Sequence, residues 1–383
     1  KTICIMNSKN VITMKNKIHR FCLLPVLYLL ILLLMAGCNG SDKASPSENI
    51  ICDPDNGGIT LPEGFCATLV IDSLGLRPDH SARHIAVAPN GDIYMKTRST
   101  EGGIVALRDT NGDYRADIIK YFGNMNETKE GILWETGVAI HNGYIWASNT
   151  TAVYRWPMPK GGALVPEGEP EMVVSGFPQQ QSHASKAFTF DNKGNLYVAV
   201  GAPSNACQTE ERTPGSPGIE PCPLLEEHGG IWRFDANKTG QTFSAAARYA
   251  TGLRNVVGLD WNTTADALFV MQHGRDQLHT LWPDFYTEEE SAELPAESMY
   301  EVKEGDRFSW PYGYYDHLKK MLMLSPEYGG NGKIPISESK FSGQFKEPTI
   351  GFPGHWAPND LLFYTGKQFP EKYRSGAFIT FIG

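Results

Sequence analysis

The sequence lacks the short motifs of several large enzyme classes. It has no glycine-rich phosphate loop, no nucleophile elbow and no spacing typical of zinc ligands, which gives little support to a nucleotide enzyme or a serine hydrolase. Positive charge is also scarce. The 383 residues carry a formal net charge of −9, so nothing indicates a polyanionic partner such as a nucleic acid. No long amphipathic helical pattern occurs, which leaves short β-strands as the main signal.

Long hydrophobic runs are limited to one, near the N-terminus. A basic stretch at 14–20 precedes an apolar run at 21–35, and small residues then lead to Cys38. About 15 apolar residues are too few to span a membrane, which takes ~20. The pattern predicts a bacterial lipoprotein signal, with cleavage before Cys38 and lipid on its thiol.

This signal divides the chain into three parts. We expect residues 1–37 to be upstream sequence and signal peptide, and residues 38–49 to be the lipidated cysteine and a polar tether. Residues 50–383 would be the folded domain. The protein would then be anchored in the bacterial cell envelope by its lipid, facing the periplasm or the cell exterior.

Cysteine is sparse, with seven in the chain. Outside the signal segment and the lipid site there remain Cys52, Cys66, Cys207 and Cys222, an even number in two local pairs. For an exported chain we predict the disulfides Cys52–Cys66 and Cys207–Cys222, each closing a loop of about 15 residues and contributing ~3 kcal/mol in the chain-entropy model. Two pairs of free buried thiols are the alternative.

What the sequence does contain is a repeated hairpin. In the clearest copy, apolar segments at 187–190 and 196–200 flank a turn rich in Asn and Gly, and His183 lies just upstream. Related copies occur at 84–95, 137–146 and 258–270, with a weaker one at 361–381. The first four copies follow one another at steps of 53, 50 and 71 residues, and the next step of 102 leaves room for one more divergent unit.

A unit of this length, rich in short strands and Gly/Pro turns, is typical of one four-stranded propeller blade. We therefore predict an all-β fold, a six-bladed β-propeller whose last blade is apparently truncated at the end of the sequence. A pair of β-sandwiches is the alternative.

A cluster of oxygen-bearing side chains lies at Asp109, Asn111, Asp113 and Asp117. Oxygen ligands at alternate positions let a tight loop wrap around a hard cation such as Ca²⁺, so these residues are candidate ligands of a structural calcium ion. Tyr114 stands where an EF-hand loop has glycine, so the loop is not an EF-hand. A solvated turn is the alternative.

Two further loops, at 250–258 and 271–277, carry arginines beside repeat strands. Loops at one end of propeller strands converge on the central channel, so both can meet His183 in space. The forked donors of arginine suit a planar, anionic, oxygen-rich ligand, with ordinary surface charges as the alternative. Aromatic segments at 310–315 and 355–360 are suited to stacking on flat rings or sugars, or to packing between blades.

Six segments together resemble the glucose/sorbosone dehydrogenase family: 61–67, 84–94, His183 with its hairpin, 252–255, 272–277 and 355–366. Members of that family are soluble six-bladed propellers that use pyrroloquinoline quinone (PQQ) and calcium to oxidise sugars. The similarity is greatest to the sorbosone- and pyranose-dehydrogenase branch. It implies a sugar substrate (an aldose, sorbosone or a pyranose) and an external electron acceptor, either a quinone or a cytochrome.

The resemblance also implies roles for individual residues. His183 matches the general base, which takes the proton of the sugar hydroxyl while hydride passes to the quinone. Arg254 and Asn255 match residues that hold the quinone and stabilise its developing oxyanion. Many relatives have Gly-Asp after the histidine's hairpin, where the aspartate orients the base. Here the residues are Gly201 and Ala202, which leaves open what orients His183.

Other positions match the surroundings of the cofactor. The backbone carbonyls of Gly274 and Arg275 match those that ligate the calcium ion of PQQ, and Asp276 would lie close by. Arg83 and His355 are further candidates for contact with the cofactor.

Two other functions stay open on the sequence. One is a non-catalytic, surface-anchored propeller that binds glycans or proteins. The other is a calcium-dependent hydrolase of the lactonase type, which needs calcium ringed by carboxylates in the channel. Carbonyls and arginines around the expected channel favour an anionic quinone over such a carboxylate cage.

Overall fold

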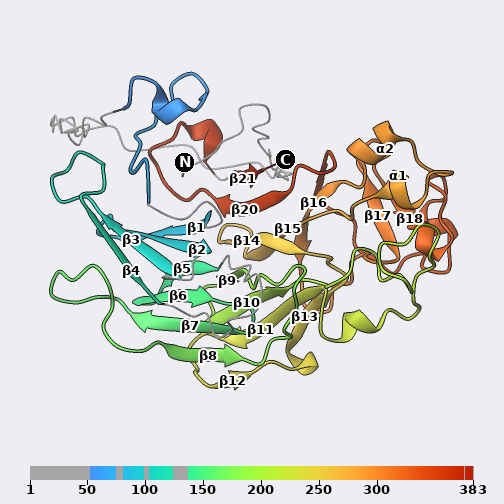
Figure 1. The fold of residues 1–383 in the computed structure, drawn as a ribbon, viewed down its shortest axis with the longest axis horizontal. Coiled ribbons are helices and arrows are strands. Elements are labelled where there is room, and N and C mark those ends of the chain that lie inside the picture. Colours follow the sequence, from blue (N-terminus) through green and yellow to red (C-terminus); the bar gives the residue numbers. More distant parts are fainter. Residues whose placement is uncertain (1–51, 75–80, 99–102, 124–136, 375, 383) are drawn as a thin grey trace, which may run out of the picture.

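The computed structural model of the chain describes residues 52–74, 81–98, 103–123, 137–374 and 376–382 (Figure 1). In this part of the chain, four antiparallel meanders follow one another around a common centre, which is the arrangement of a β-propeller. A two-stranded sheet follows them. The all-β fold is confirmed, and the sheets form a ring of blades rather than a pair of sandwiches. Six blades and a truncated last blade stay predictions.

Each blade begins with its innermost strand. The first sheet contains β1 (Ser81–Val87), β2 (Ile93–Arg98), β3 (Ile104–Arg108) and β4 (Ile118–Phe122). The second contains β5 (Val138–His141), β6 (Tyr144–Ser148), β7 (Ala152–Pro157) and β8 (Glu171–Ser175), with β12 (Gln241–Thr242) parallel to β8. The third contains β9 (Phe188–Phe190), β10 (Asn195–Val200), β11 (Gly230–Asp235) and β13 (Arg248–Thr251). The fourth contains β14 (Val256–Asn262), β15 (Ala267–Gln272), β16 (Glu297–Val302) and β19 (Ile350–Phe352).

The remaining elements are short. The strand pairs are β17 (Gly313–Asp316) with β18 (Met321–Leu324), and β20 (Pro358–Phe363) with β21 (Ala377–Phe381). The two α-helices among the described residues are α1 (Leu278–Leu281) and α2 (Glu288–Glu293). The 3₁₀ turns are η1 (Asn56–Gly58), η2 (Pro223–Glu226), η3 (Ala245–Ala247), η4 (Pro326–Tyr328), η5 (Ile336–Glu338) and η6 (Glu371–Tyr373).

The repeated hairpins are the inner strand pairs of successive sheets, as the alternation of apolar residues predicts. In the third blade, Asp191 closes the turn between β9 and β10 because its Oδ1 accepts the N–H groups of Lys193 and Asn195, both at 2.8 Å. The long step before the last copy holds no further blade among the described residues. It contains β16, β19 and a lobe made of α1, α2, β17 and β18, which lies beside the fourth blade in Figure 1.

The core lies between the blades. Successive side chains of a strand point to opposite faces, so each middle strand contributes to two layers. Trp146 of β6 packs with Val198 and Trp232 toward the third blade, whereas Ala147 faces Tyr94 and Ile104 of the first. This alternation is why the blades bury nearly continuous apolar strands.

The two ends of the described chain meet. The Phe65 ring packs against those of Phe369 and Tyr373, with centroids 5.0 and 4.9 Å apart. His84 on β1 bonds through Nε2 to the carbonyl oxygen of Asn359 on β20, at 2.8 Å. These contacts join the first blade to the β20–β21 sheet.

Both predicted disulfides, Cys52–Cys66 and Cys207–Cys222, are present. The predicted lipid site, Cys38, and the signal segment lie outside the described residues. In the described part of the chain, no helix has the length and hydrophobicity needed to cross a membrane.

Candidate active site

Five loops bring polar side chains together at one end of the third and fourth blades. His183 lies before β9, and Gly201 and Ala202 follow β10. Residues 252–255 join β13 to β14, residues 273–277 follow β15, and residues 355–357 precede β20. The predicted convergence of the histidine loop with the two arginine-bearing loops is therefore observed.

His183 is held by the main chain of Ala202. Its Nδ1 lies 2.5 Å from the carbonyl oxygen of Ala202, which can only accept, so Nδ1 carries the proton and Nε2 keeps its lone pair. Burial, reinforced by the nearby charge of Arg254, lowers the pKa of His183 to about 3. The imidazole is therefore neutral near pH 7. The backbone of Ala202 supplies the orientation that the sequence left open.

The backbone beside this histidine is tightly packed. A Cβ on Gly201 would lie 2.7 Å from both Cβ and O of His183 and 2.9 Å from Oδ1 of Asn255, closer than real contacts allow. Gln180 donates from Nε2 to the carbonyl oxygens of Ser182, His183 and Gly201, at 2.8, 3.0 and 2.9 Å. Glycine at 201 is thus required for these segments to approach, and His183 itself has a positive φ of 53°.

Arg254 is almost completely buried, with 2% of its surface exposed. Its guanidinium donates to the carbonyl of Gly274 at 2.8 Å, to O and Oδ1 of Asn205 at 3.2 and 3.0 Å, and to Asp276 Oδ2 at 2.9 Å. These contacts take four of its five N–H groups and leave one on Nη1. Ala202 donates its N–H to the carbonyl of Arg254 at 2.8 Å, so one residue positions both His183 and Arg254.

Asp276 lies at the edge of the site, with 43% of its side chain exposed. Arg254 and Arg212 both donate to its Oδ2 at 2.9 Å, and Nδ1 of His355 lies 4.0 Å from its Oδ1. Partial burial opposes ionisation, but the charges of Arg254 and Arg212 outweigh it and hold the pKa of Asp276 below its usual value. The carboxylate is therefore charged and neutralises part of the arginine cluster.

A second histidine, His273, holds Asn255. Nε2 of His273 lies 2.6 Å from the carbonyl oxygen of Pro358, and Nδ1 lies 3.5 Å from Nδ2 of Asn255. Oδ1 of Asn255 is buried without a hydrogen-bond partner among the described residues. Burial lowers the pKa of His273 to about 4, so this imidazole is neutral too.

Two buried acids, Glu297 and Glu327, hydrogen-bond to the loop after β15. Oε2 of Glu297 accepts the N–H of Gly274 at 2.9 Å, and burial raises the pKa of Glu297 to about 7. Arg275 donates to Glu327 at 2.5 Å, with both side chains buried. Glu327 also accepts from Trp282 of the lobe at 2.9 Å.

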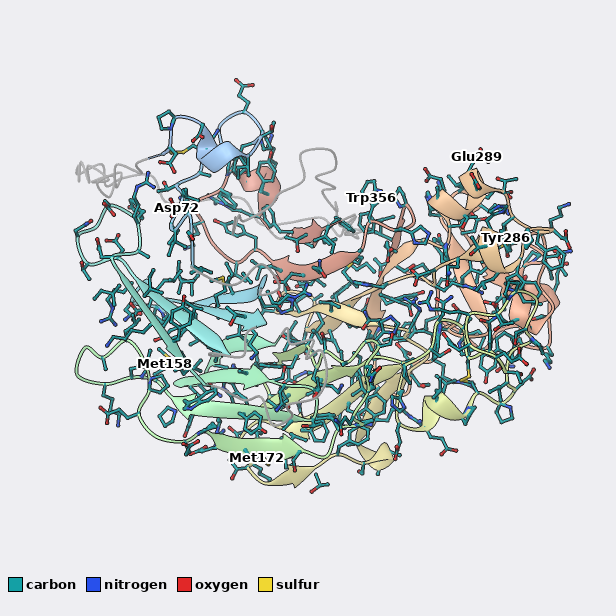
Figure 2. The ribbon with its side chains drawn as sticks, in the orientation of Figure 1. Asp72, Met158, Met172, Tyr286, Glu289 and Trp356 are labelled. Atoms are coloured by element: carbon teal, nitrogen blue, oxygen red, sulfur yellow. A yellow bond between two sulfur atoms is a disulfide. The ribbon has the colours of Figure 1, made fainter. Side chains whose placement is uncertain are left out.

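Figure 2 labels Tyr286 and Glu289 in this lobe and Trp356 toward β20.

Sequence reasoning assigned no role to Asn205, Arg212, Gln180, His273 and Glu297. Asn205 is 1% exposed and bonds both Arg254 and the backbone of Asp276, yet it reads as an ordinary turn residue between Ser and Ala. Only His273 carried a signal, since it lies within the 272–277 segment that supported the family resemblance. Of the other four residues, only Arg212 lies within the loop that the Cys207–Cys222 disulfide closes.

The two remaining candidates for contact with the cofactor are Arg83 and His355. Arg83 is on β1 next to His84. His355 contacts Ser291 through Nε2 at 2.8 Å and only approaches Asp276.

The Asp109–Asp117 loop forms a self-bonded turn: Oδ1 of Asp109 accepts from Asn111 and Gly112, Oδ2 from Tyr114, and Asp117 accepts from Thr110. Across the described ranges, no group of three His, Cys, Asp or Glu residues could hold a metal ion. Structural calcium at this loop stays a prediction.

A small cavity of about 10 Å³, room for one water molecule, lies beside Arg254. Its walls include Arg254, His273, Gly274, Arg275 and Trp310. His183 is not among the residues that line this cavity.

Comparison with known proteins gives the family. The TrAA12-like family matches residues 59–383, which is most of the chain. This chain belongs to the TrAA12-like family. The resemblance to PQQ-dependent sugar dehydrogenases is thereby confirmed. No sequence among the curated proteins matches the chain.

Solved structures agree with the fold. An enzyme of Carbohydrate-Active Enzymes Family AA12 from Trichoderma reesei superposes with a TM-score of 0.57 at 16% identity, covering 77% of each chain. The PQQ domain of pyranose dehydrogenase from Coprinopsis cinerea gives 0.56 at 16% identity, covering 76% of this chain and 69% of that one. The soluble aldose sugar dehydrogenase of Escherichia coli gives 0.52 at 16% identity, covering 78% and 79%. The family and these folds point to a sugar oxidoreductase.

Proposed function

We propose that this protein is a PQQ-dependent sugar dehydrogenase, with His183 as the general base. The observation that carries this is the state of His183: a neutral imidazole, fixed by Ala202 through Nδ1, with Nε2 unbonded by any described residue. A general base needs a lone pair directed at the substrate and a pKa that keeps it deprotonated. The aldose, sorbosone or pyranose preference belongs to the same proposal.

The residues around His183 fit an oxygen-rich anionic cofactor. Arg254 keeps one N–H group, and Arg212 is a half-exposed guanidinium at the edge of the site. When bound, PQQ supplies a carbonyl carbon that accepts hydride from the sugar. Nε2 of His183 takes the hydroxyl proton, so the carbon bearing that hydroxyl loses two electrons and becomes a carbonyl. Arg254 stabilises negative charge that develops beside it.

Calcium is the component that the contacts support least. The carbonyl of Gly274, the proposed ligand, already accepts from the positively charged Arg254. A divalent cation on this oxygen would lie beside a guanidinium, which is electrostatically unfavourable. We therefore assign no catalytic step to calcium, although the Arg275 carbonyl remains a candidate ligand.

The cellular setting is part of the proposal. The basic, apolar and small-residue pattern ending at Cys38 supports a lipid anchor in the bacterial envelope. Electrons would pass from the reduced cofactor to a quinone or cytochrome. We propose a six-bladed propeller on the strength of the family resemblance.

Reconstitution with PQQ tests the function. The purified protein is mixed with PQQ, with and without Ca²⁺, and reduction of an electron-accepting dye is followed with a panel of aldoses and ketoses. We expect sugar-dependent dye reduction that requires PQQ. His183→Ala should lower kcat about 10²- to 10⁴-fold while PQQ binding, followed by tryptophan fluorescence, is retained.

His141→Ala is a matched control, because His141 lies in the second blade and stacks on Phe190. This variant should keep its activity. Hydrolysis of lactones without PQQ would favour the hydrolase instead. Binding of glycans with no turnover would favour the non-catalytic propeller.

A further inference from the structure

Asp276 and His355 each leave one hydrogen-bond acceptor open at the edge of the site. Arg254 and Arg212 both donate to Oδ2 of Asp276, and no described residue donates to its Oδ1. Nε2 of His355 lies 2.8 Å from the carbonyl oxygen of Ser291, which can only accept, so Nε2 carries a hydrogen. Nδ1 of the neutral imidazole then has only a lone pair, and no donor in the described part of the chain bonds to it.

The two open acceptors are close together and within reach of a ligand. Oδ1 of Asp276 and Nδ1 of His355 lie 4.0 Å apart, too far for a hydrogen bond between them. Their side chains are 43% and 38% exposed, and neither atom is among the buried polar atoms that lack a partner. A ligand that reaches this edge meets two acceptors and must bring two donors.

The arrangement is fixed by hydrogen bonds to the surrounding chain. Gly354 donates its N–H to the carbonyl of Glu293 at 2.8 Å, and His355 donates to that of Ser291, so two bonds join this loop to α2. Two arginines hold the Asp276 carboxylate from the opposite side. The pair is therefore ordered before any ligand binds.

The pair belongs to the same site as the proposed base. Arg254 bonds Asp276 through its guanidinium and accepts the N–H of Ala202 on its carbonyl, and the carbonyl of Ala202 holds His183. Burial lowers the pKa of His183, and the charges of Arg254 and Asp276 act on it in opposite directions. Asp276 is thus within electrostatic range of the imidazole, on the exposed side of the buried Arg254.

The chemistry of the two acceptors selects among ligands. An anionic quinone with carboxylate groups brings further acceptors and negative charge, which the carboxylate of Asp276 repels. A sugar hydroxyl carries one hydrogen and satisfies one acceptor, so two hydroxyls on neighbouring carbons satisfy both. A water molecule, with two hydrogens, is the other neutral candidate.

We propose that Asp276 and His355 are specificity residues for the sugar: Oδ1 of Asp276 and Nδ1 of His355 each accept a hydrogen bond from one of two neighbouring hydroxyls, beyond the carbon on which His183 acts. This inference rests on the proposed function and names its substrate class, sugars with a free vicinal diol outside the reacting group. Both residues then bind the sugar rather than the quinone, in contrast to the role implied by the family resemblance.

Sugar binding can be tested without the cofactor. D-glucose is titrated into the purified protein, and binding is followed by saturation-transfer NMR of the sugar protons. His355→Leu removes an acceptor and should weaken binding about tenfold. His355→Asn keeps an acceptor oxygen near the place of Nδ1 and tolerates the φ of 52°, so it should retain most of the affinity. His141→Ala, in the second blade, is the control and should bind glucose as the wild type does.

Monodeoxy analogues of D-glucose supply the second test, in the PQQ-loaded protein. Loss of either of two neighbouring hydroxyls should lower kcat/KM about 10- to 100-fold, because one acceptor then has no donor. In His355→Leu, one of these two penalties should fall to under about threefold, and the other should persist because Asp276 is still present. Each penalty is a ratio within one protein, so a loss of stability in the variant does not affect it.

The two proposals fail in different ways. No glucose binding by the wild type, equal binding by His355→Leu, or penalties unchanged in that variant would mean that only water occupies the pair, and would leave the dehydrogenase intact. Absence of PQQ-dependent turnover with any sugar of the panel would defeat the proposed function, whereas the cofactor-free titration would still decide whether the pair binds sugar.

Discussion

His183 and His273 are both neutral in the folded protein, and for the same reason. Each is largely removed from water, and each gives its one N–H to a backbone carbonyl, of Ala202 and Pro358 respectively. Burial lowers their pKa values to about 3 and about 4, from 6.5 in an unfolded chain. Between about pH 4 and pH 6.5, the two histidines consequently stay neutral in the folded protein, whereas they take up protons in the unfolded chain.

This difference predicts a pH-dependent contribution to stability. The His183 contribution is fully present above about pH 6.5 and is lost as the pH falls toward 3, because only the unfolded state binds the proton there. Glu297 and Asp260, whose pKa values burial raises to about 7 and about 6, act in the opposite direction. Because these acids also change the total stability with pH, the His183 contribution is measured as the difference in unfolding free energy between the wild type and His183→Gln.

The measurement is the urea midpoint at several pH values between 4 and 7. The stability of the wild type relative to His183→Gln should rise with pH up to about 6.5 and then level off. A difference between the two proteins that does not change with pH would contradict a depressed pKa for His183.

At the scale of elements, the loop closed by Cys207–Cys222 organises the site. It carries Arg212, which bonds Asp276. Asn205, which bonds Arg254, lies two residues before this loop. The Cys52–Cys66 loop has nearly the same length, with sequence separations of 14 and 15. Its contacts are with residues 67–69, Arg115, Phe369 and Tyr373, none of which belongs to the site. The Cys52–Cys66 disulfide is therefore a matched control for Cys207–Cys222.

We expect the two disulfides to differ in function more than in stability. Replacing either pair with serine should lower the free energy of unfolding by about 2–4 kcal/mol. Only loss of Cys207–Cys222 should weaken PQQ binding, by about tenfold, since Arg254 and Asp276 then lose their ordered partners. Denaturant titration and fluorescence titration with PQQ measure the two effects, and equal loss of PQQ binding in both variants would refute the assignment.

The elements show what sequence could and could not predict. Alternating apolar residues identified the hairpins, because strand periodicity is local. The meeting of His183 and Arg254 followed from the rule that propeller loops converge at one end. The contacts of His273 with Pro358, 85 residues later, and of Asn205 with Arg254, 49 residues later, had no local signal. They depend on how two loops fold over each other, and no spacing in the sequence encodes that.

At the scale of the whole molecule, the described chain is joined end to end by aromatic rings. Phe65 packs between Phe369 and Tyr373. Because Phe65 is partly exposed, Phe65→Ala should destabilise the protein by about 1–3 kcal/mol, less than the 3–5 of a fully buried ring. Leu318→Ala, at a side chain 65% exposed, should change stability by under about 0.5 kcal/mol.

Thermal or urea unfolding of the two variants checks this prediction. Equal stabilities for Phe65→Ala and Leu318→Ala would mean that the contact between the two ends contributes nothing measurable.

The main chain of Ala202 carries out the orienting task that the family resemblance assigns to an aspartate side chain. Every amino acid except proline offers both a carbonyl and an N–H, but Ala202 is completely buried, so only a residue of similar size could replace it without disturbing the imidazole or Arg254. A search for related enzymes that demands an acidic residue after the histidine's hairpin would pass over proteins built this way.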